Sequence, residues 1–161
     1  MANAIGFDPV PSEWTALMQA HGGDQQAKHA ALCCTFAYQA RKRGWTVYLC
    51  PAVEGPAEPD ALIVNDDSSI YVEVEAESGD PERRMRKWRN LADLQGFVAL
   101  CANNETVRER LVTEARAAAQ DGVATDVSTL IQKARIGEDG FWVEEWGRQR
   151  NSRQQAAGSQ S

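Results

Sequence analysis

The stretch EPDALIVNDDSSIYVEVEAESGDPERRMRKW, which runs from Glu58 to Trp88, decides the fold and carries the candidate chemistry. Within it, the runs DALIVN (60–65) and IYVEVE (70–75) are rich in aliphatic, β-branched and aromatic residues, a composition typical of strands. The hydrophilic residues 66–69 between the two runs favour a turn. The stretch therefore predicts a β-hairpin, followed by a basic helix that begins at Pro81.

Acidic side chains stand at both ends of this hairpin. We expect the turn to pair Asn65 with Ile70, and this register sets Glu75 opposite Asp60. Because side chains alternate between the two faces of a strand, Glu73 shares a face with these two carboxylates. A slip of one residue, or a bulge, would instead send Asp60 to the other face.

Three carboxylates on one face of a hairpin indicate a cation site. Opposed side chains lie about 5 Å apart and diagonal ones about 7–8 Å apart. Carboxylates this close repel each other unless they are protonated or bridged by a cation. Because hard divalent ions prefer oxygen ligands, we expect Asp60, Glu73 and Glu75 to bind Mg²⁺ (or Mn²⁺). The alternative is that Glu73 and Glu75 are solvent-facing positions of an amphipathic strand.

The length and composition indicate one globular unit. A chain of 161 residues can bury a substantial core in a single domain. We expect a globular domain over residues 1–147, with its core in 24–120, and a disordered tail over 148–161, which lacks an apolar pattern. The net charge of −6 gives no overall attraction to nucleic acid or to an anionic membrane. No secretory segment and no apolar run of about 20 residues is present, so we expect a soluble, cytoplasmic protein without a membrane partner.

The remaining pattern predicts the α/β order of the other elements. Apolar spacing, capping residues and glycines mark helices over 13–20, 24–43, 81–94, 105–120 and 128–134, and strands over 45–50, 60–65, 70–75 and 97–102. Residues 123–127 form a short strand or an extended link, and 141–146 an extended or helical closing segment. Strands followed by a helix and a further strand favour a mixed sheet flanked by helices.

The cysteines and histidines predict no zinc site. Cys33 and Cys34 are adjacent on an expected helix, no CxxC pair exists, and neither His21 nor His29 stands at zinc-site spacing from a cysteine. We interpret the cysteines as buried free thiols, and His29 as a polar helix position rather than a general base.

The order of elements and the acidic motif together resemble a known family. Pro59-Asp60, then twelve residues, then Glu73-Val74-Glu75 is similar to the core motif of the PD-(D/E)xK nuclease superfamily. The resemblance covers Asp24 to Ala119 and implies a restriction-endonuclease-like fold with αβββαβ order. It also implies that Asp60 and Glu73 are Mg²⁺ ligands.

The chain departs from the family pattern at one position. The family places a lysine two residues after the second acid, where this chain has Glu75. Some members carry Glu there and others move the lysine to the following helix, which would make Lys87 the catalytic amine, with Arg83 and Arg84 as further candidates. A Glu at this position is also compatible with a chain that has lost catalysis. On the first core helix, where members often carry an acidic or amide residue, Gln39 is the candidate, ahead of Gln25 and His29.

The basic helix is the expected contact to nucleic acid. Arg83, Arg84 and Arg86 follow the carboxylates directly and could contact phosphates. The alternative is a solvated helix face paired with its own acidic residues. Trp88 in the same run could stack on a base, but core packing explains it better.

The sequence thus favours a Mg²⁺-dependent, endonuclease-like domain that hydrolyses DNA phosphodiester bonds, with Asp60, Glu73, Glu75 and Lys87 as catalytic residues. One alternative is an inactive member of the same fold that binds DNA or protein as an accessory module. Another is an interaction protein whose carboxylates are ordinary surface residues. A homodimer or a larger assembly would suit the cutting of both strands of a duplex, although no residue pattern indicates either.

Overall fold

The computed structural model describes residues 24–76 and 79–147, which form a mixed α/β unit around a six-stranded sheet. The helices are α2 (Asp24–Lys42), α3 (Pro81–Gln95), α4 (Glu105–Arg116) and α5 (Val127–Arg135). The strands are β1 (Thr46–Leu49), β2 (Ala61–Val64), β3 (Ser69–Glu75), β4 (Val98–Ala102), β5 (Gly122–Asp126) and β6 (Glu144–Trp146). The predicted αβββαβ order is confirmed by α2, β1, β2, β3, α3 and β4.

Some sequence predictions were less complete. Residues 123–127 contain a true strand, β5, and only 144–146 of the closing segment are strand. The helix predicted over 105–120 ends at Arg116. The helix predicted over 13–20 and the tail at 148–161 lie outside the described residues.

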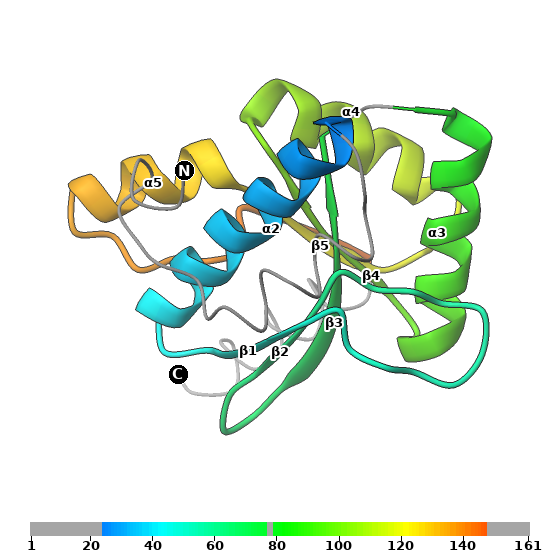
Figure 1. Ribbon diagram of the computed structural model, residues 1–161, viewed down its shortest axis with the longest axis horizontal. Coiled ribbons are helices and arrows are strands. Elements are labelled where there is room, and N and C mark those ends of the chain that lie inside the picture. Colours follow the sequence, from blue (N-terminus) through cyan, green and yellow to red (C-terminus); the bar gives the residue numbers. More distant parts are fainter. Residues whose placement is uncertain (1–23, 77–78, 148–161) are drawn as a thin grey trace.

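The sheet has helices on both faces (Figure 1). Its strands follow each other in sequence order, with β1, β2 and β3 antiparallel, β3, β4 and β5 parallel, and β6 antiparallel to β5. One apolar cluster joins α2 and α5 to the sheet, and a second joins α3 and α4 to the opposite face. Among the described residues, no helix is both long enough and apolar enough to cross a bilayer.

The hairpin register differs by two residues from the predicted one. The structure pairs Val64 with Ser69 and Ala61 with Val72, and Asp60, which precedes β2, donates its backbone N–H to the carbonyl oxygen of Val72. The cause is the turn: the Asn65 side chain accepts hydrogen bonds from the backbone N–H groups of residues 67 and 68. Asn65 therefore belongs to the turn and not to the strand. A shift of two residues keeps the side chains of β2 and β3 on their predicted faces. Asp60 lies just before β2, and its side chain remains a hydrogen-bonding neighbour of Glu73.

Helix α3 is fixed at both ends by its sequence. Asp80 caps its N-terminus by accepting a hydrogen bond from the N–H of residue 82, and Pro81 begins the helix. Gly96 ends it in a left-handed conformation with φ of 88°, which favours glycine. Trp88 and Leu91 are fully buried against the sheet, as predicted for Trp88, and this packing sets the rotation of the helix about its axis.

The edge strand β6 depends on a glycine in β5. A Cβ atom on Gly122 would lie 2.0 Å from Cζ2 of Trp146, which is buried. We expect Gly122→Ala to lower the free energy of unfolding by about 1–3 kcal/mol, measured by urea denaturation, because the indole must move. The double variant Gly122→Ala/Trp146→Leu should lose less free energy of unfolding than the two single variants lose in total. Full additivity would contradict this account.

Candidate functional site

The predicted carboxylates meet at one end of β2 and β3. Asp60, Glu73 and Glu75 are 5%, 2% and 7% exposed, so all three are buried. Glu73 and Glu75 lie beside Leu100 and Ala102 of β4, on the face that α3 and α4 cover. The interpretation of these side chains as solvent-facing strand positions is therefore wrong for Glu73 and Glu75.

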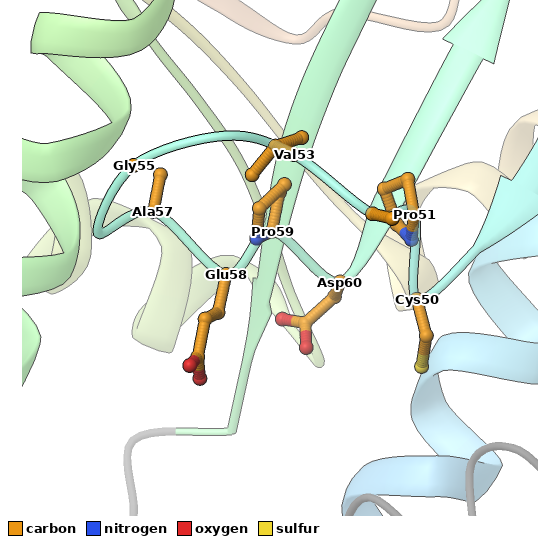
Figure 2. Close-up of a pocket in the computed structure, with 9 residues that line it drawn as sticks. Cys50, Pro51, Val53, Gly55, Ala57, Glu58, Pro59 and Asp60 are labelled. Atoms are coloured by element: carbon orange, nitrogen blue, oxygen red, sulfur yellow. The ribbon is translucent and has the colours of Figure 1, made fainter.

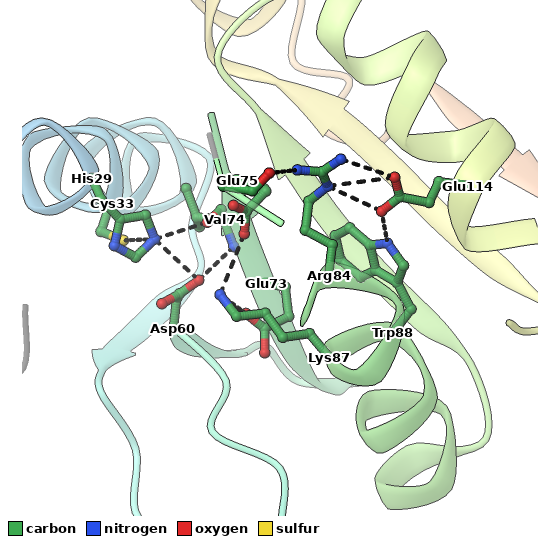
Figure 3. Close-up of polar contacts among 11 residues, drawn as sticks. His29, Cys33, Asp60, Glu73, Val74, Glu75, Arg84, Lys87, Trp88 and Glu114 are labelled. Atoms are coloured by element: carbon green, nitrogen blue, oxygen red, sulfur yellow. Dashed lines mark hydrogen bonds and ion pairs between the residues drawn. The ribbon is translucent and has the colours of Figure 1, made fainter. Parts of the chain in front are cut away.

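Asp60 is held by groups from three elements (Figure 3). Its Oδ2 accepts a hydrogen bond of 2.8 Å from the backbone N–H of Val74 and lies 3.4 Å from Nε2 of His29 on α2. Its backbone carbonyl accepts a hydrogen bond from the N–H of Cys50. Burial alone would raise the pKa of Asp60, but the hydrogen bond and charge of His29, together with Lys87 and the Val74 N–H, lower it below the ordinary value. Asp60 is therefore an anion in the folded protein at neutral pH.

Glu73 has the opposite electrostatic character. Burial, followed by the charge of neighbouring Asp60 and a hydrogen bond to it, raises the pKa of Glu73 well above its ordinary value. Its Oε2 atom is buried and has no hydrogen-bond partner, and Nζ of Lys87 is 4.0 Å away. A buried carboxylate oxygen without a donor, beside a second carboxylate, fits a ligand for a divalent cation.

Lys87 reaches this cluster from α3. Its Nζ donates to Oε2 of Glu75 at 3.3 Å, and Figure 3 shows the side chain extending toward Asp60 and Glu73. Burial would lower the pKa of Lys87, but Glu73, Glu75 and Asp60 together raise it above the ordinary value. Lys87 therefore remains an ammonium ion, which can donate hydrogen bonds but cannot act as a base.

A second set of possible metal ligands adjoins the carboxylates. His29, Cys33 and Asp60 each offer one ligand atom, and these three atoms lie within 4.8 Å of one another. Nε2 of His29 also lies 2.8 Å from the carbonyl oxygen of Val74 and 3.7 Å from Sγ of Cys33. The site can therefore bind a metal. This group was not predicted from the sequence. The i, i+4 spacing of His29 and Cys33, which places both side chains on one helix face, is a signal that could have indicated a shared metal ion.

A pocket of about 360 Å³ opens next to Asp60. It is formed by the proline-containing loop between β1 and β2, and its lining residues include Cys50, Val53, Ala57, Glu58 and Asp60. Figure 2 shows the side chains of Cys50, Glu58 and Asp60 pointing to the same side of this loop. Of the three carboxylates, only Asp60 lines this pocket.

The predicted nucleic-acid contacts fall into different environments. Arg83 and Arg86 are exposed on α3, and Arg83 precedes Lys87 by one helical turn. Arg84, in contrast, is buried and donates to both oxygens of Glu114, which also accepts a hydrogen bond from the indole N–H of Trp88. Arg84 therefore joins α3 to α4 and is not part of the exposed basic face.

Gln39 lies away from the carboxylates. It is buried, and its Oε1 accepts a hydrogen bond from Arg43, which also donates to the carbonyl of Leu130 on α5. Gln39 follows His29 by ten residues, a separation of about 15 Å along the helix axis. On α2, His29 and not Gln39 contacts the carboxylate cluster.

Comparison with known proteins adds little to this geometry. No family model matches the chain, and no curated protein matches it. Among solved structures, the chain is similar to a CdiA-CT/CdiI toxin and immunity complex from Burkholderia pseudomallei, with 12% identity, a TM-score of 0.40, and coverage of 66% of this chain and 84% of that one. A similarity of this size supports no conclusion about function.

The raised pKa of Glu73 makes a prediction about stability. The pKa of Glu73 is higher in the folded protein than in the unfolded chain. The protonated carboxyl group therefore contributes its full stability at a pH below the pKa of the unfolded chain. This contribution is lost as the pH rises through the pKa of the folded protein. Glu73→Gln cannot lose a proton. In metal-free buffer we therefore expect it to be more stable than the wild type by about 1–2 kcal/mol at pH 8, with a smaller difference at pH 5.

Glu75→Gln is the matched control, because Glu75 is paired with Lys87. Urea denaturation of both variants in EDTA at the two pH values measures the effect. Two results would contradict this account of Glu73 as the carboxylate that burial destabilises. One is a Glu73→Gln protein that is less stable than the wild type at pH 8. The other is an equal gain of stability in Glu75→Gln.

Proposed function

We propose that this protein is a divalent-metal-dependent phosphodiester hydrolase that acts on DNA. The observation that carries the proposal is the buried pair of Asp60 and Glu73, with a carboxylate oxygen of Glu73 that has no hydrogen-bond donor. Carboxylates buried together at a solvent-connected pocket are costly without a cation, so their presence favours metal binding. The similarity of the Pro59-Asp60 and Glu73-Val74-Glu75 segments to the PD-(D/E)xK nuclease motif supports the same function.

Asp60 and Glu73 would hold the ion, with Glu75 beside them, and Mg²⁺ or Mn²⁺ suits these oxygen ligands. When bound, such an ion polarises a phosphoryl oxygen and lowers the pKa of a water molecule. His29 orients Asp60, because its Nε2 lies 3.4 Å from Oδ2 of that carboxylate. These residues come from α2, from β3 and from the position just before β2, so the fold holds them in place before a substrate arrives.

Lys87 and Glu75 supply the proton chemistry in this proposal. Hydrolysis adds the oxygen of water to phosphorus and breaks the bond to the leaving sugar oxygen. As an ammonium ion, Lys87 would donate hydrogen bonds to the phosphate or to the attacking water, in the role of the family lysine. Glu75, which lies at the family lysine position and already accepts a hydrogen bond from Lys87, would take the proton from water.

A cleavage assay tests the proposal. We expect single- or double-stranded DNA to be cut in the presence of Mg²⁺ or Mn²⁺, and Asp60→Asn or Glu73→Gln to lower the rate by at least about 100-fold. Asp66→Asn, in the exposed hairpin turn, removes a carboxylate near the site in sequence and should leave the rate unchanged. RNA substrates run in parallel decide which nucleic acid is preferred.

Metal binding is measured separately by calorimetric titration with Mn²⁺. We expect wild-type protein to bind, and Asp60→Ala/Glu73→Ala to show no binding while keeping its circular dichroism spectrum. A folded protein that binds Mn²⁺ but cuts neither DNA nor RNA would favour the inactive accessory module over the hydrolase. A protein that binds no ion would contradict the hydrolase and would leave the inactive accessory module as the explanation.

Arg83 and Arg86 would contact the phosphate backbone from the exposed face of α3. The affinity for duplex DNA should then fall as the salt concentration rises. In a plot of log association constant against log salt concentration, Arg83→Ala/Arg86→Ala should reduce the magnitude of the slope by about 1.8, or about 0.9 for each lost phosphate contact. Arg135→Ala, an exposed arginine on α5 at the other face of the sheet, is the control for net charge. Fluorescence anisotropy measures these affinities. If the two variants have equal salt-dependence slopes, α3 does not contact the DNA.

A further inference from the structure

The group formed by His29, Cys33 and Asp60 differs in chemistry from the carboxylate cluster. It combines one imidazole nitrogen, one sulfur and one carboxylate oxygen, whereas Glu73 and Glu75 contribute oxygen alone. Mg²⁺ prefers six oxygen ligands in octahedral geometry. Sulfur and imidazole ligands instead favour softer ions, of which Zn²⁺ is the commonest in proteins.

The two distances from Nε2 of His29 fit tetrahedral coordination, and Sγ of Cys33 lies within 4.8 Å of the Asp60 carboxylate. With Zn–S bonds of about 2.3 Å and Zn–N and Zn–O bonds of about 2.0–2.1 Å, tetrahedral angles place sulfur about 3.5 Å from nitrogen and nitrogen about 3.3 Å from oxygen. In the structure, Sγ of Cys33 is 3.7 Å from Nε2 of His29. Nε2 of His29 is 3.4 Å from Oδ2 of Asp60.

The backbone holds these ligands in place. His29 and Cys33 lie one turn apart on α2, and Cys33 is fully buried in the core between α2 and the sheet. Asp60 is fixed by the N–H of Val74 and by the strand pairing on both of its sides. The pocket lined by residues 50–60 reaches Asp60, so an ion has a path from solvent.

We propose that His29, Cys33 and Asp60 form a second cation site, selective for a borderline-soft divalent ion such as Zn²⁺, and that this site shares Asp60 with the oxygen-lined cluster. The three residues leave the fourth tetrahedral position to water from the pocket. The site does not depend on hydrolase activity, because its ligands and its geometry are independent of any substrate.

Binding at this site exchanges protons for the ion. The S–H bond of Cys33 breaks as the Zn–S bond forms, and the proton leaves to solvent. Nε2 of His29 lies 2.8 Å from the carbonyl oxygen of Val74, and to bind the ion it gives up the proton of this hydrogen bond. In a neutral ring that proton moves through solvent to Nδ1, and in an imidazolium ring it leaves to solvent, so that the Nε2 lone pair binds the ion. The ion is the only reactant that the exchange requires.

Sharing Asp60 makes the two sites compete. A tetrahedral ion on the α2 side draws Oδ2 of Asp60 away from Glu73, so the oxygen-lined cluster loses one of its two principal ligands. If the hydrolase proposal is correct, Zn²⁺ should inhibit the Mg²⁺-supported reaction, and Cys33→Ser should relieve this inhibition without loss of Mg²⁺ activity.

Co²⁺ titration of the full chain tests the site directly, because Co²⁺ replaces Zn²⁺ and reports its ligands by absorption. We expect a thiolate-to-cobalt charge-transfer band and visible bands of tetrahedral intensity, both removed by excess Zn²⁺. Cys33→Ser and Cys33→Ala should abolish the charge-transfer band. They should also weaken Zn²⁺ binding by more than about 100-fold, since losing even an outer-shell partner costs about 10–100-fold.

The neighbouring thiols provide matched controls. Cys34→Ala changes the next residue on α2, which is also buried, and Cys50→Ser changes the thiol at the pocket; both should keep the band. Circular dichroism of each variant tests whether it is folded, and Cys33→Ser, which preserves the size of the side chain, replaces Cys33→Ala if the latter does not fold. A wild-type protein without a thiolate band, or a band lost in Cys34→Ala or Cys50→Ser but kept in Cys33→Ser, would overturn the proposal. Absence of nuclease activity would not affect this result, so the two proposals fail separately.

Discussion

The burial of Asp60 against Glu73 is the constraint on which the site depends. Two adjacent carboxylates removed from water cost several kcal/mol unless cations or protons compensate them. The fold supplies this compensation from both helical layers, with His29 from α2 on one side and Lys87 from α3 on the other. Burial, and then the remaining excess of negative charge, raise the pKa of Glu73 well above its ordinary value. The metal-free state is thus neutralised by groups that a divalent ion would replace.

The order of strands and helices explains why these groups meet. The antiparallel hairpin brings Asp60, the residue before β2, next to Glu73 near the end of β3. Because β3 and β4 are parallel, the chain must cross over between them, and α3 forms this crossover. The crossover helix covers the face onto which Glu73 and Glu75 project, and so Lys87 in its second turn reaches the acidic cluster.

Much of the fold could be predicted from the sequence because its signals are local. Alternating strands, the Asp80-Pro81 helix start and Gly96 at the helix end depend on near neighbours alone. The observed register of the hairpin differs by two residues from the predicted one, because a hydrogen bond to the Asn65 side chain within the turn sets this register. The face of each β3 side chain, Glu73 and Glu75 included, is unaffected by this difference, since an even shift preserves alternation.

The parts of the site that could not be predicted depend on contacts between distant residues. Arg84 and Arg83 are adjacent in a basic run, but only the structure shows that Glu114, thirty residues later, holds Arg84 in the interior. His29 precedes Asp60 by thirty-one residues, and no periodic pattern links a helix position to a strand end. The sequence predicts that His29 is a polar helix position and that Cys33 is a buried thiol. The structure shows that both side chains lie close to the carboxylate of Asp60.

The position of Asp60 between two ligand sets limits which ions the protein can bind at once. One side offers carboxylate oxygens with an ammonium ion nearby, and the other offers nitrogen and sulfur. In the proposed function, a hard ion would gain from Glu73 and would release Lys87 from its carboxylate partners, which would free the ammonium for an anionic ligand. A soft ion would gain from Cys33 and would leave Lys87 paired with Glu75. Because a single aspartate would serve both sets, occupation of one side would weaken the other, and the identity of the ion would decide whether Lys87 is available.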